Sequence, residues 1–233
     1  MSCIKKFLLA TFICLCILAC GTDPTPQPAD IEPTIESKVE QEVEQEVSEG
    51  DGHSEIVINI QRGSVARYIV KEHLARWISA KDVSGETELV TGQIRVSPEG
   101  ALIPKDSQFV VNLKSLKSDE PKRDNYIRKN ALESNKFPEA VFEINAMEGW
   151  QGPLPTAGSI NVSLTGDMTI HGVTKEITWG LVADVEQDIV TGIAKTEIDF
   201  DLFNIKKPRL PFILTLEDTL RLELDFVAKV QSN

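Results

Sequence analysis

Two segments of the sequence, 158–170 and 219–230, alternate apolar and polar residues with a period of two. A helix would scatter these apolar side chains around its axis, whereas a strand places them all on one face. Shorter alternating stretches, separated by turn residues, occupy 87–96, 109–113, 140–146, 177–184 and 189–200. Strands with one polar face favour antiparallel pairing, and long strands with one apolar face must close on themselves or pack against a second sheet. The sequence therefore predicts an all-β domain that forms an extended antiparallel β-barrel. A barrel of about eight strands leaves room for a ligand inside.

One stretch, 118–135, lacks the alternation. Ser118 or Asp119 can cap a helix that has Pro121 in its first turn. Ile127 and Ala131 would then form a small apolar face, which Tyr126 extends in one alternative. We therefore expect a short helix or ordered loop near 118–135 that lies over the barrel.

The amino terminus has the form of an export signal. Lys5 and Lys6 precede a 13-residue apolar run, 7–19, that ends in Ile17-Leu18-Ala19-Cys20. About 20 apolar residues are needed to span a membrane, so the run favours a secretory signal peptide. The ending resembles the lipobox of bacterial lipoproteins, which implies cleavage before Cys20 and its modification with acyl chains such as palmitate. An ordinary signal peptide with a chance cysteine, or a short uncleaved anchor, is the alternative.

A linker is expected between the signal peptide and the barrel. Residues 21–55 hold 11 acidic residues and one basic residue, so most of the net charge of −12 belongs to this segment. Its prolines and repeated glutamates favour a solvated, extended chain; an acidic metal-binding or protein-docking tail is the alternative. The sequence thus divides into a signal peptide (1–19), a lipidated acidic Pro/Glu-rich tether (20–55) and a barrel domain (56–233). The predicted location is extracytoplasmic, on a bacterial membrane facing the periplasm or the cell surface.

Composition excludes several classes of function for the barrel domain. All four cysteines lie within residues 3–20, so the domain has no disulfide framework, zinc ribbon or cysteine nucleophile. The acidic balance argues against nucleic-acid binding, which needs a basic patch. His53, His73 and His171 form no metal-ligand spacing, and no nucleophile elbow, phosphate loop or paired carboxylates are evident. We therefore expect no catalytic residues, no metal site and no enzyme activity.

Several blocks of the chain resemble the YceI-like family. They are the segments 123–127 (RDNYI), 137–142 (FPEAVF) and 164–175 (LTGDMTIHGVTK), with weaker matches at 92–94 (GQI) and 111–116 (VNLKSL). The resemblance covers roughly residues 64–230 and implies an extended lipocalin-like barrel whose lumen, in some members, holds a long isoprenoid or related lipid. The chain departs from the pattern near 71–75, where a His-Ser pair is absent, and in the loop 149–157, which reads as an insertion.

Candidate ligand contacts follow from the inward faces. Apolar side chains expected to line the lumen are Phe109, Phe142, Ile160, Val162, Leu164, Ile177, Trp179, Leu181, Leu222, Leu224 and Phe226. Arg123, Arg128 and His171 are candidate contacts for a polar headgroup. The alternative for each lumen residue is a solid core, and for the polar three a structural ion pair or a turn hydrogen bond.

The sequence supports a membrane-tethered, extracytoplasmic protein that sequesters or carries a long apolar lipid. This lipid would be a polyisoprenoid or a quinone-like molecule. The protein's partners would be that long-chain apolar small molecule and a membrane, with no nucleic acid. A non-catalytic structural or interaction lipoprotein with a filled core is the first alternative. An enzyme acting on a lipid-like substrate is the second, and it would need a polar cluster inside the lumen. Oligomeric state stays undetermined at this point.

Overall fold

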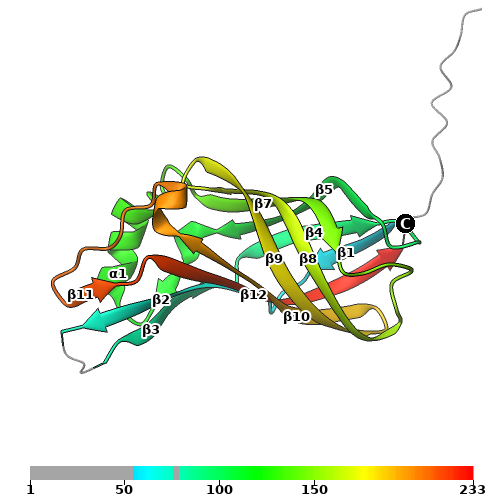
Figure 1. The fold of residues 1–233 in the computed structure, drawn as a ribbon, viewed down its shortest axis with the longest axis horizontal. Coiled ribbons are helices and arrows are strands. Elements are labelled where there is room, and N and C mark those ends of the chain that lie inside the picture. Colours follow the sequence, from blue (N-terminus) through cyan, green and yellow to red (C-terminus); the bar gives the residue numbers. More distant parts are fainter. Residues whose placement is uncertain (1–54, 76–78, 233) are drawn as a thin grey trace, which may run out of the picture. The chain divides into compact units, whose positions relative to one another are not determined.

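The structure is a computed structural model that describes residues 55–75 and 79–232. Within these residues the chain forms twelve strands and one short α-helix (Figure 1). The strands are β1 (Ile56–Ile60), β2 (Val65–Leu74), β3 (Lys81–Thr87), β4 (Val90–Val96), β5 (Leu102–Asn112), β6 (Lys117–Ser118), β7 (Glu139–Glu148), β8 (Ala157–Ile170), β9 (Val173–Glu186), β10 (Ile189–Asp199), β11 (Ile213–Leu216) and β12 (Thr219–Ser232). The predicted signal peptide and nearly all of the predicted tether lie outside the described residues.

The strands close into an antiparallel barrel, as the alternation predicts. Neighbours in the ring follow the order β1, β4, β5, β7, β8, β9, β10 and β12, and β12 pairs with β1 to complete it. Strand β12 is shared along its length: Ala228 lies opposite Ile60 of β1, whereas Leu222 lies opposite Tyr68 of β2. Strands β1 and β2 therefore act as one long strand, and β4 and β3 run beside it as its partner.

A buried serine bridges the break between β1 and β2. The Ser64 hydroxyl is 1% exposed and accepts a hydrogen bond from the Val227 amide at 3.0 Å. The same oxygen lies 2.9 Å from the Gln61 carbonyl oxygen. The side chain thus supplies hydrogen bonds at the point where the main chain turns between the two strands.

Bulges and glycines curve the wall. The register shifts between Ile144 and Ala146 where β7 meets β8, and Gly166 lies at this point. A Cβ atom on Gly166 would lie 2.0 Å from the Glu143 carbonyl oxygen, so only glycine allows the two strands to approach this closely. Such bulges give the sheet the curvature that closure requires.

The inside of the barrel differs between its two ends. At the end that holds the carboxyl terminus (right in Figure 1), small and β-branched side chains fill the interior as a solid core. They are Val162, Ala183, Val185 and Val190, each at most 4% exposed. Among the described residues, none of these lines the cavity at the opposite end.

A helical segment lies at that opposite end, beside β2, β3 and β11 (left in Figure 1). Helix α1 (Pro121–Tyr126) continues into the wider turns of η2 (Ile127–Ala131), and Ile127 and Ala131 are buried. The predicted caps were wrong, because Glu120 is the N-cap and its carboxylate accepts from the Lys122 amide at 3.2 Å. Ser118 ends β6 instead, and Asp119 pairs with Arg123.

Candidate functional site: an apolar cavity in the barrel

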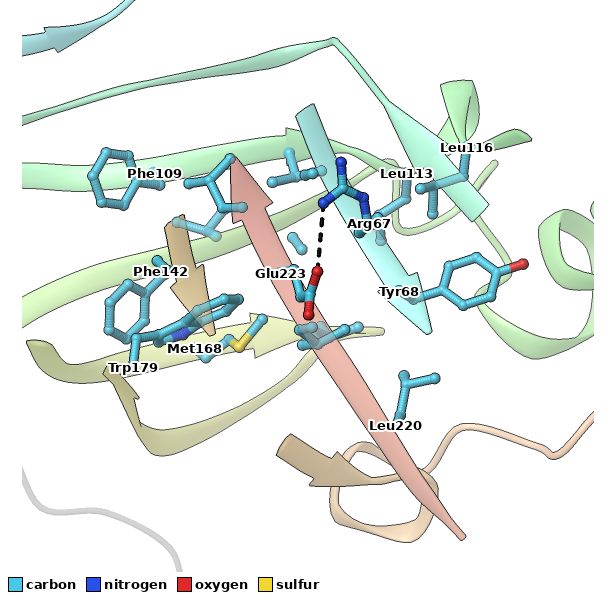
Figure 2. A pocket seen from close by; sticks show the side chains of 18 of the residues that line it. Arg67, Tyr68, Phe109, Leu113, Leu116, Phe142, Met168, Trp179, Leu220 and Glu223 are labelled. Carbon is cyan, nitrogen blue, oxygen red and sulfur yellow. Dashed lines mark hydrogen bonds and ion pairs between the residues drawn. The ribbon is translucent and has the colours of Figure 1, made fainter. Parts of the chain in front are cut away.

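The helix end of the barrel encloses a cavity of about 170 Å³ (Figure 2). Its wall is built mainly from aliphatic and aromatic side chains of β2, β5, β7, β8, β9 and β12. An engineered apolar cavity of about 150 Å³ in another protein stays dry and binds benzene. The cavity therefore has the size and chemistry to hold a small apolar group.

The cavity is bounded at its two ends by different structures. On β8 the wall runs from Ile170 through Met168 to Leu164, and on β9 it ends at Leu181. Beyond these residues on β8 and β9 lies the solid core, whereas on β12 the cavity wall continues to Ala228. At the helix end the wall changes from strands to the helical segment and to the η3 region (Phe200–Phe203) with the loop that follows. The residues contributed there are Ile127, Ala131, Leu132, Phe200, Ile205 and Pro208.

Most of the predicted lumen residues meet in this cavity. Those that line it are Phe109, Phe142, Leu164, Trp179, Leu181, Leu222, Leu224 and Phe226. Three others do not. Val162 faces inward but lies in the solid core, Ile160 is half-buried two residues beyond it on β8, and Ile177 is half-buried on β9 against the core.

Sequence reasoning missed the contribution of the first strands. Ile58, Ile60 and Ile94 line the cavity from β1 and β4, and Tyr68 and Val70 line it from β2. Ala66, Tyr68, Val70 and Glu72 share one face of β2, and all of them are buried except the half-buried Tyr68. The glutamate at the end of this series, Glu72, disguises the apolar face.

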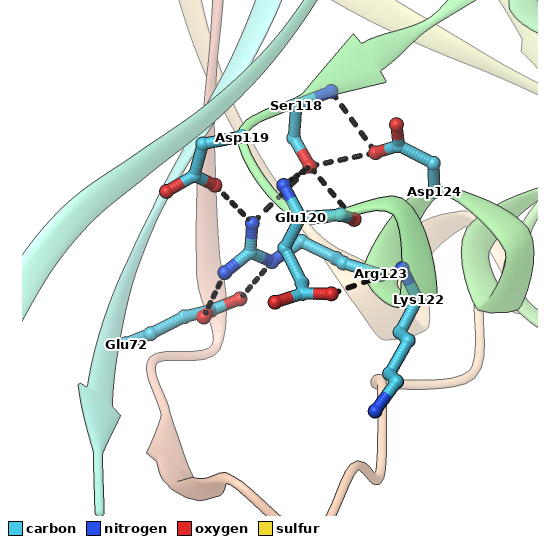
Figure 3. Close-up of polar contacts among 7 residues, drawn as sticks. All are labelled: Glu72, Ser118, Asp119, Glu120, Lys122, Arg123 and Asp124. Carbon is cyan, nitrogen blue, oxygen red and sulfur yellow. Dashed lines mark hydrogen bonds and ion pairs between the residues drawn. The ribbon is translucent and has the colours of Figure 1, made fainter. Parts of the chain in front are cut away.

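A buried ion cluster forms part of the cavity wall at the helix end, where Arg123 and Glu72 line it; Figure 3 shows the contacts within the cluster. Arg123 and Glu72 are each 1% exposed, and the guanidinium binds both carboxylate oxygens, with Nε–Oε1 3.2 Å and Nη2–Oε2 3.1 Å. The third nitrogen, Nη1, donates to Asp119 at 2.6 Å and lies 3.2 Å from the Ser118 hydroxyl. Asp124 in turn accepts from that hydroxyl at 2.6 Å. All three nitrogens of Arg123 are thus engaged within the protein.

The cluster shifts the ionisation of its members. Burial raises the pKa of Glu72, and the adjacent Arg123 charge opposes this rise. Burial disfavours the Arg123 charge, but the hydrogen bond to Asp119 and the pairing with Glu72 outweigh it, so the pKa of Arg123 is raised. Burial also raises the pKa of Tyr68, which keeps the phenol neutral. The polar end of the cavity therefore presents a compensated ion pair.

The other two candidate headgroup residues lie away from the cavity wall. Arg128 donates to the Leu116 carbonyl at 3.3 Å. His171 occupies the turn between β8 and β9, with Nε2 2.8 Å from Glu133 and Nδ1 3.4 Å from the Phe203 carbonyl oxygen. The hydrogen bond with His171 lowers the pKa of Glu133. His171 therefore joins three segments at the helix end.

A second ion pair lies on the wall itself (Figure 2). Arg67 of β2 is opposite Glu223 of β12, with Nη1 3.4 Å from Oε2, and it also binds Asp225 at 2.6 Å. Both Arg67 and Glu223 alternate with inward-facing apolar neighbours along their strands. They fasten β2 to β12, and both are among the residues that line the cavity.

Two buried polar atoms on the cavity wall have no hydrogen-bond partner in the described part of the chain. They are the Trp179 indole Nε1 and the Tyr68 hydroxyl. The Tyr68 ring lies over Gly85, where a Cβ atom would be 2.7 Å from the Tyr68 hydroxyl oxygen, and Gly85 pairs with Ser118 of the ion cluster. The Trp179 indole lies beside Phe142, with ring centroids 6.1 Å apart.

Residues 55–75 and 79–232 contain no group of three or more histidine, cysteine or acidic side chains arranged to hold a metal ion. No helix in the described residues has both the length and the apolar character to cross a membrane.

An eight-stranded antiparallel barrel with an apolar cavity at one end defines a protein of the lipocalin-like class. A family model described as the YceI-like domain matches residues 51–228. The chain therefore belongs to the YceI-like family, as its sequence blocks indicated.

Relatives of known sequence match part of the chain. UPF0312 proteins of Pseudomonas putida (strain W619) and Pseudomonas fluorescens (strain SBW25) are each 32% identical to it over 114 residues. Each match spans 45% of this chain and 56% of the relative, so the chain spans about half the length of these relatives.

Solved structures share the fold at low sequence identity. BcnA of Burkholderia cenocepacia is similar with a TM-score of 0.54 and 15% identity, over 73% of this chain and 99% of that one. A protein of Saccharophagus degradans, described as a polyisoprenoid binding domain implicated in plant cell wall breakdown, has a TM-score of 0.54 and 10% identity, over 75% and 98%. The YceI protein of Campylobacter jejuni has a TM-score of 0.51 and 17% identity, over 69% and 92%.

Proposed function

We propose that this protein binds a long, apolar, isoprenoid-type molecule in the barrel cavity and sequesters or carries it outside the cytoplasm. The observation that carries the proposal is the difference between the two ends of the barrel. The same alternating strands fill one end with side chains and leave the other hollow. A protein that needed only stability would gain by filling the second end too, since each lost methylene of burial costs about 0.8 kcal/mol.

The chemistry of the wall supports an apolar ligand. A five-carbon isoprene unit moved from water into such a cavity gains about 4 kcal/mol before the cost of immobilising it. The cavity holds a benzene-sized portion, so the rest of a long chain leaves at the helix end, where loop residues such as Phe200, Ile205 and Pro208 form the wall. The description of the Saccharophagus degradans protein as polyisoprenoid binding agrees with this assignment.

The membrane tether is a separate part of the proposal and rests on the sequence. The apolar run before Cys20 and the acidic segment after it would hold the barrel at a bacterial membrane through acyl chains. Replacing the lipidation site, Cys20→Ser, is expected to prevent the acyl modification that mass spectrometry of the membrane-bound wild-type chain detects. An unmodified wild-type Cys20 would refute this part alone.

The binding test uses the full chain purified gently from cells, followed by organic extraction and mass spectrometry. The expected result is a long-chain apolar lipid in stoichiometric amount. Ala194→Phe places a large ring in the cavity, because Ala194 is 5% exposed and lines it between β9 and β12. This variant should lose most of the lipid.

The matched control is Val182→Phe, which adds similar bulk at an outward-facing position of β9 that is 51% exposed. It should retain the lipid. Equal lipid content in the two variants, or none in the wild-type protein, would count against binding in the cavity and in favour of a structural or interaction role.

A further inference from the structure

The indole N–H of Trp179 is a hydrogen-bond donor buried in the cavity wall without an acceptor from the described chain (Figure 2). The indole nitrogen can only donate a hydrogen bond, so it needs an acceptor as its partner. Burying an unsatisfied donor costs free energy, and most such groups in proteins have a partner. The group therefore points to an acceptor that comes with a ligand.

Trp179 lies on β9 near the end of the cavity that borders the solid core. On β9 it is opposite Leu164 of β8, and only Leu181 lines the cavity beyond it toward the solid core. Phe142 packs beside the indole at 6.1 Å between centroids. An acceptor at Trp179 would therefore lie in the interior of the barrel, away from the helix end.

The other polar groups of the cavity are placed or used differently. Arg123 donates from all three of its nitrogens to Glu72, Asp119 and Ser118. The Tyr68 hydroxyl lies over Gly85 beside this cluster, at the helix end. Arg67 also lines the cavity, but its Nη1 is held by Glu223 and Asp225. Trp179 is thus the donor without an acceptor among the aliphatic and aromatic side chains of the inner cavity.

We propose that Trp179 selects apolar ligands that carry a carbonyl-type oxygen over pure hydrocarbons. The oxygen accepts the indole hydrogen bond, and the apolar tail runs from there toward Phe200 and Ile205 at the helix end. This assignment rests on the proposed function, because it requires that the cavity bind apolar molecules at all.

The test compares two probes of nearly equal shape, acetophenone and α-methylstyrene, which differ by a carbonyl oxygen in place of a methylene. The full ¹⁵N-labelled chain in phospholipid nanodiscs is titrated with each probe while the indole N–H signals are recorded. The chain has three tryptophans, and the signal missing from Trp179→Phe identifies the one of interest. Acetophenone should move this signal downfield, and α-methylstyrene should not.

The affinities give a second readout. The ratio of acetophenone to α-methylstyrene affinity should fall about fivefold in Trp179→Phe, the effect of one neutral hydrogen bond. Comparing this affinity ratio between the wild-type chain and the variant cancels the partitioning of each probe into the lipid. It also cancels the effect of the lost ring volume, which the two probes share. The matched control, Trp150→Phe, removes a half-buried indole that does not line the cavity and should leave the ratio unchanged.

The possible outcomes separate the two proposals. If both probes bind and neither the ratio nor the indole signal responds, the role of Trp179 is wrong and apolar binding stands. A ratio that falls in Tyr68→Phe but not in Trp179→Phe also overturns it, by placing the acceptor at the other donor. If neither probe binds to the wild-type chain, the binding function itself is refuted. Should Trp179→Phe fail to fold, the variants Trp77→Phe and Trp150→Phe assign the other two indole signals, and the remaining signal of the wild-type chain still decides.

Discussion

The buried pair between Arg123 and Glu72 should respond strongly to the loss of its arginine. Both side chains are 1% exposed, and the pair is bidentate. Removing one member of a buried pair typically costs 3–5 kcal/mol, because the other charge is left in a poorly polarisable surrounding. We expect Arg123→Met to cost about 3 kcal/mol of the free energy of unfolding near pH 8, at the low end because Glu72 can take up a proton. For a chain of this size that lowers Tm by roughly 6–12 °C.

The loss should depend on pH in a defined direction. Burial already raises the pKa of Glu72, and the Arg123 charge holds it down. Without that charge the folded-state pKa rises further above the unfolded value. An acid with a raised folded-state pKa loses its contribution to stability as pH increases through that window. Arg123→Met should therefore be least impaired near pH 5 and most impaired near pH 8.

Urea unfolding followed by circular dichroism at pH 5 and pH 8 measures the free energy of unfolding of the wild-type protein and the variant. The double variant Glu72→Leu/Arg123→Met removes both charges, so it should recover most of the stability and lose the extra pH dependence. An exposed pair, Arg221 with Asp82, provides the contrast: both side chains are over 40% exposed, so Arg221→Gln should cost less than 1 kcal/mol. A loss in Arg123→Met below 1 kcal/mol at pH 8, or one that grows as pH falls, would refute the reasoning.

Three further predictions concern packing and charge. Leu164→Ala, at a side chain that is 1% exposed between cavity and solid core, should cost about 2–5 kcal/mol in urea unfolding and enlarge the cavity; a cost under 1 kcal/mol would mean that the barrel collapses around the site. Gly166→Ala should destabilise or unfold the barrel, because its Cβ would lie 2.0 Å from a carbonyl oxygen of β7. The control Gly180→Ala, whose Cβ would meet nothing within 4 Å, should leave Tm nearly unchanged. Similar Tm values for the two variants would contradict the close approach of the strands at Gly166. Glu133→Gln should lose less stability than the wild-type protein between pH 5 and pH 3, since a carboxyl whose pKa is lowered by His171 contributes stability that disappears as it is protonated; parallel stability curves would argue against this contact.

The long strands were predictable because one side of each meets water. The predicted segments 158–170 and 219–230 correspond to β8 (Ala157–Ile170) and β12 (Thr219–Ser232) within one residue at their starts. Outward threonines alternate with inward aliphatic residues there, and pairs such as Thr165 with Thr178 meet across the strands at 2.9 Å. The expected strand at 87–96 was less accurate, because Thr87 ends β3 and Val90 begins β4.

The early strands were harder to predict because their inward faces are not purely apolar. Strand β2 turns Tyr68 and Glu72 inward, and β3 places Gly85 beneath the Tyr68 ring. Glu72 can be buried only because Arg123, which is 51 residues away in the sequence, brings it a bidentate charge. A local pattern of hydrophobicity carries no information about such a distant partner.

By itself the sequence determined which side of each long strand turns inward, since a period of two follows from backbone geometry alone. It also identified the family through the blocks around Arg123 and His171. Only the tertiary structure decided whether opposite walls touch. Val162 and Leu164 are neighbours on the same face of β8, yet one fills a solid core and the other lines a cavity. The difference lies in how much side-chain volume the other strands bring to each level of the barrel, and that sum over distant residues is fixed only when the ring closes.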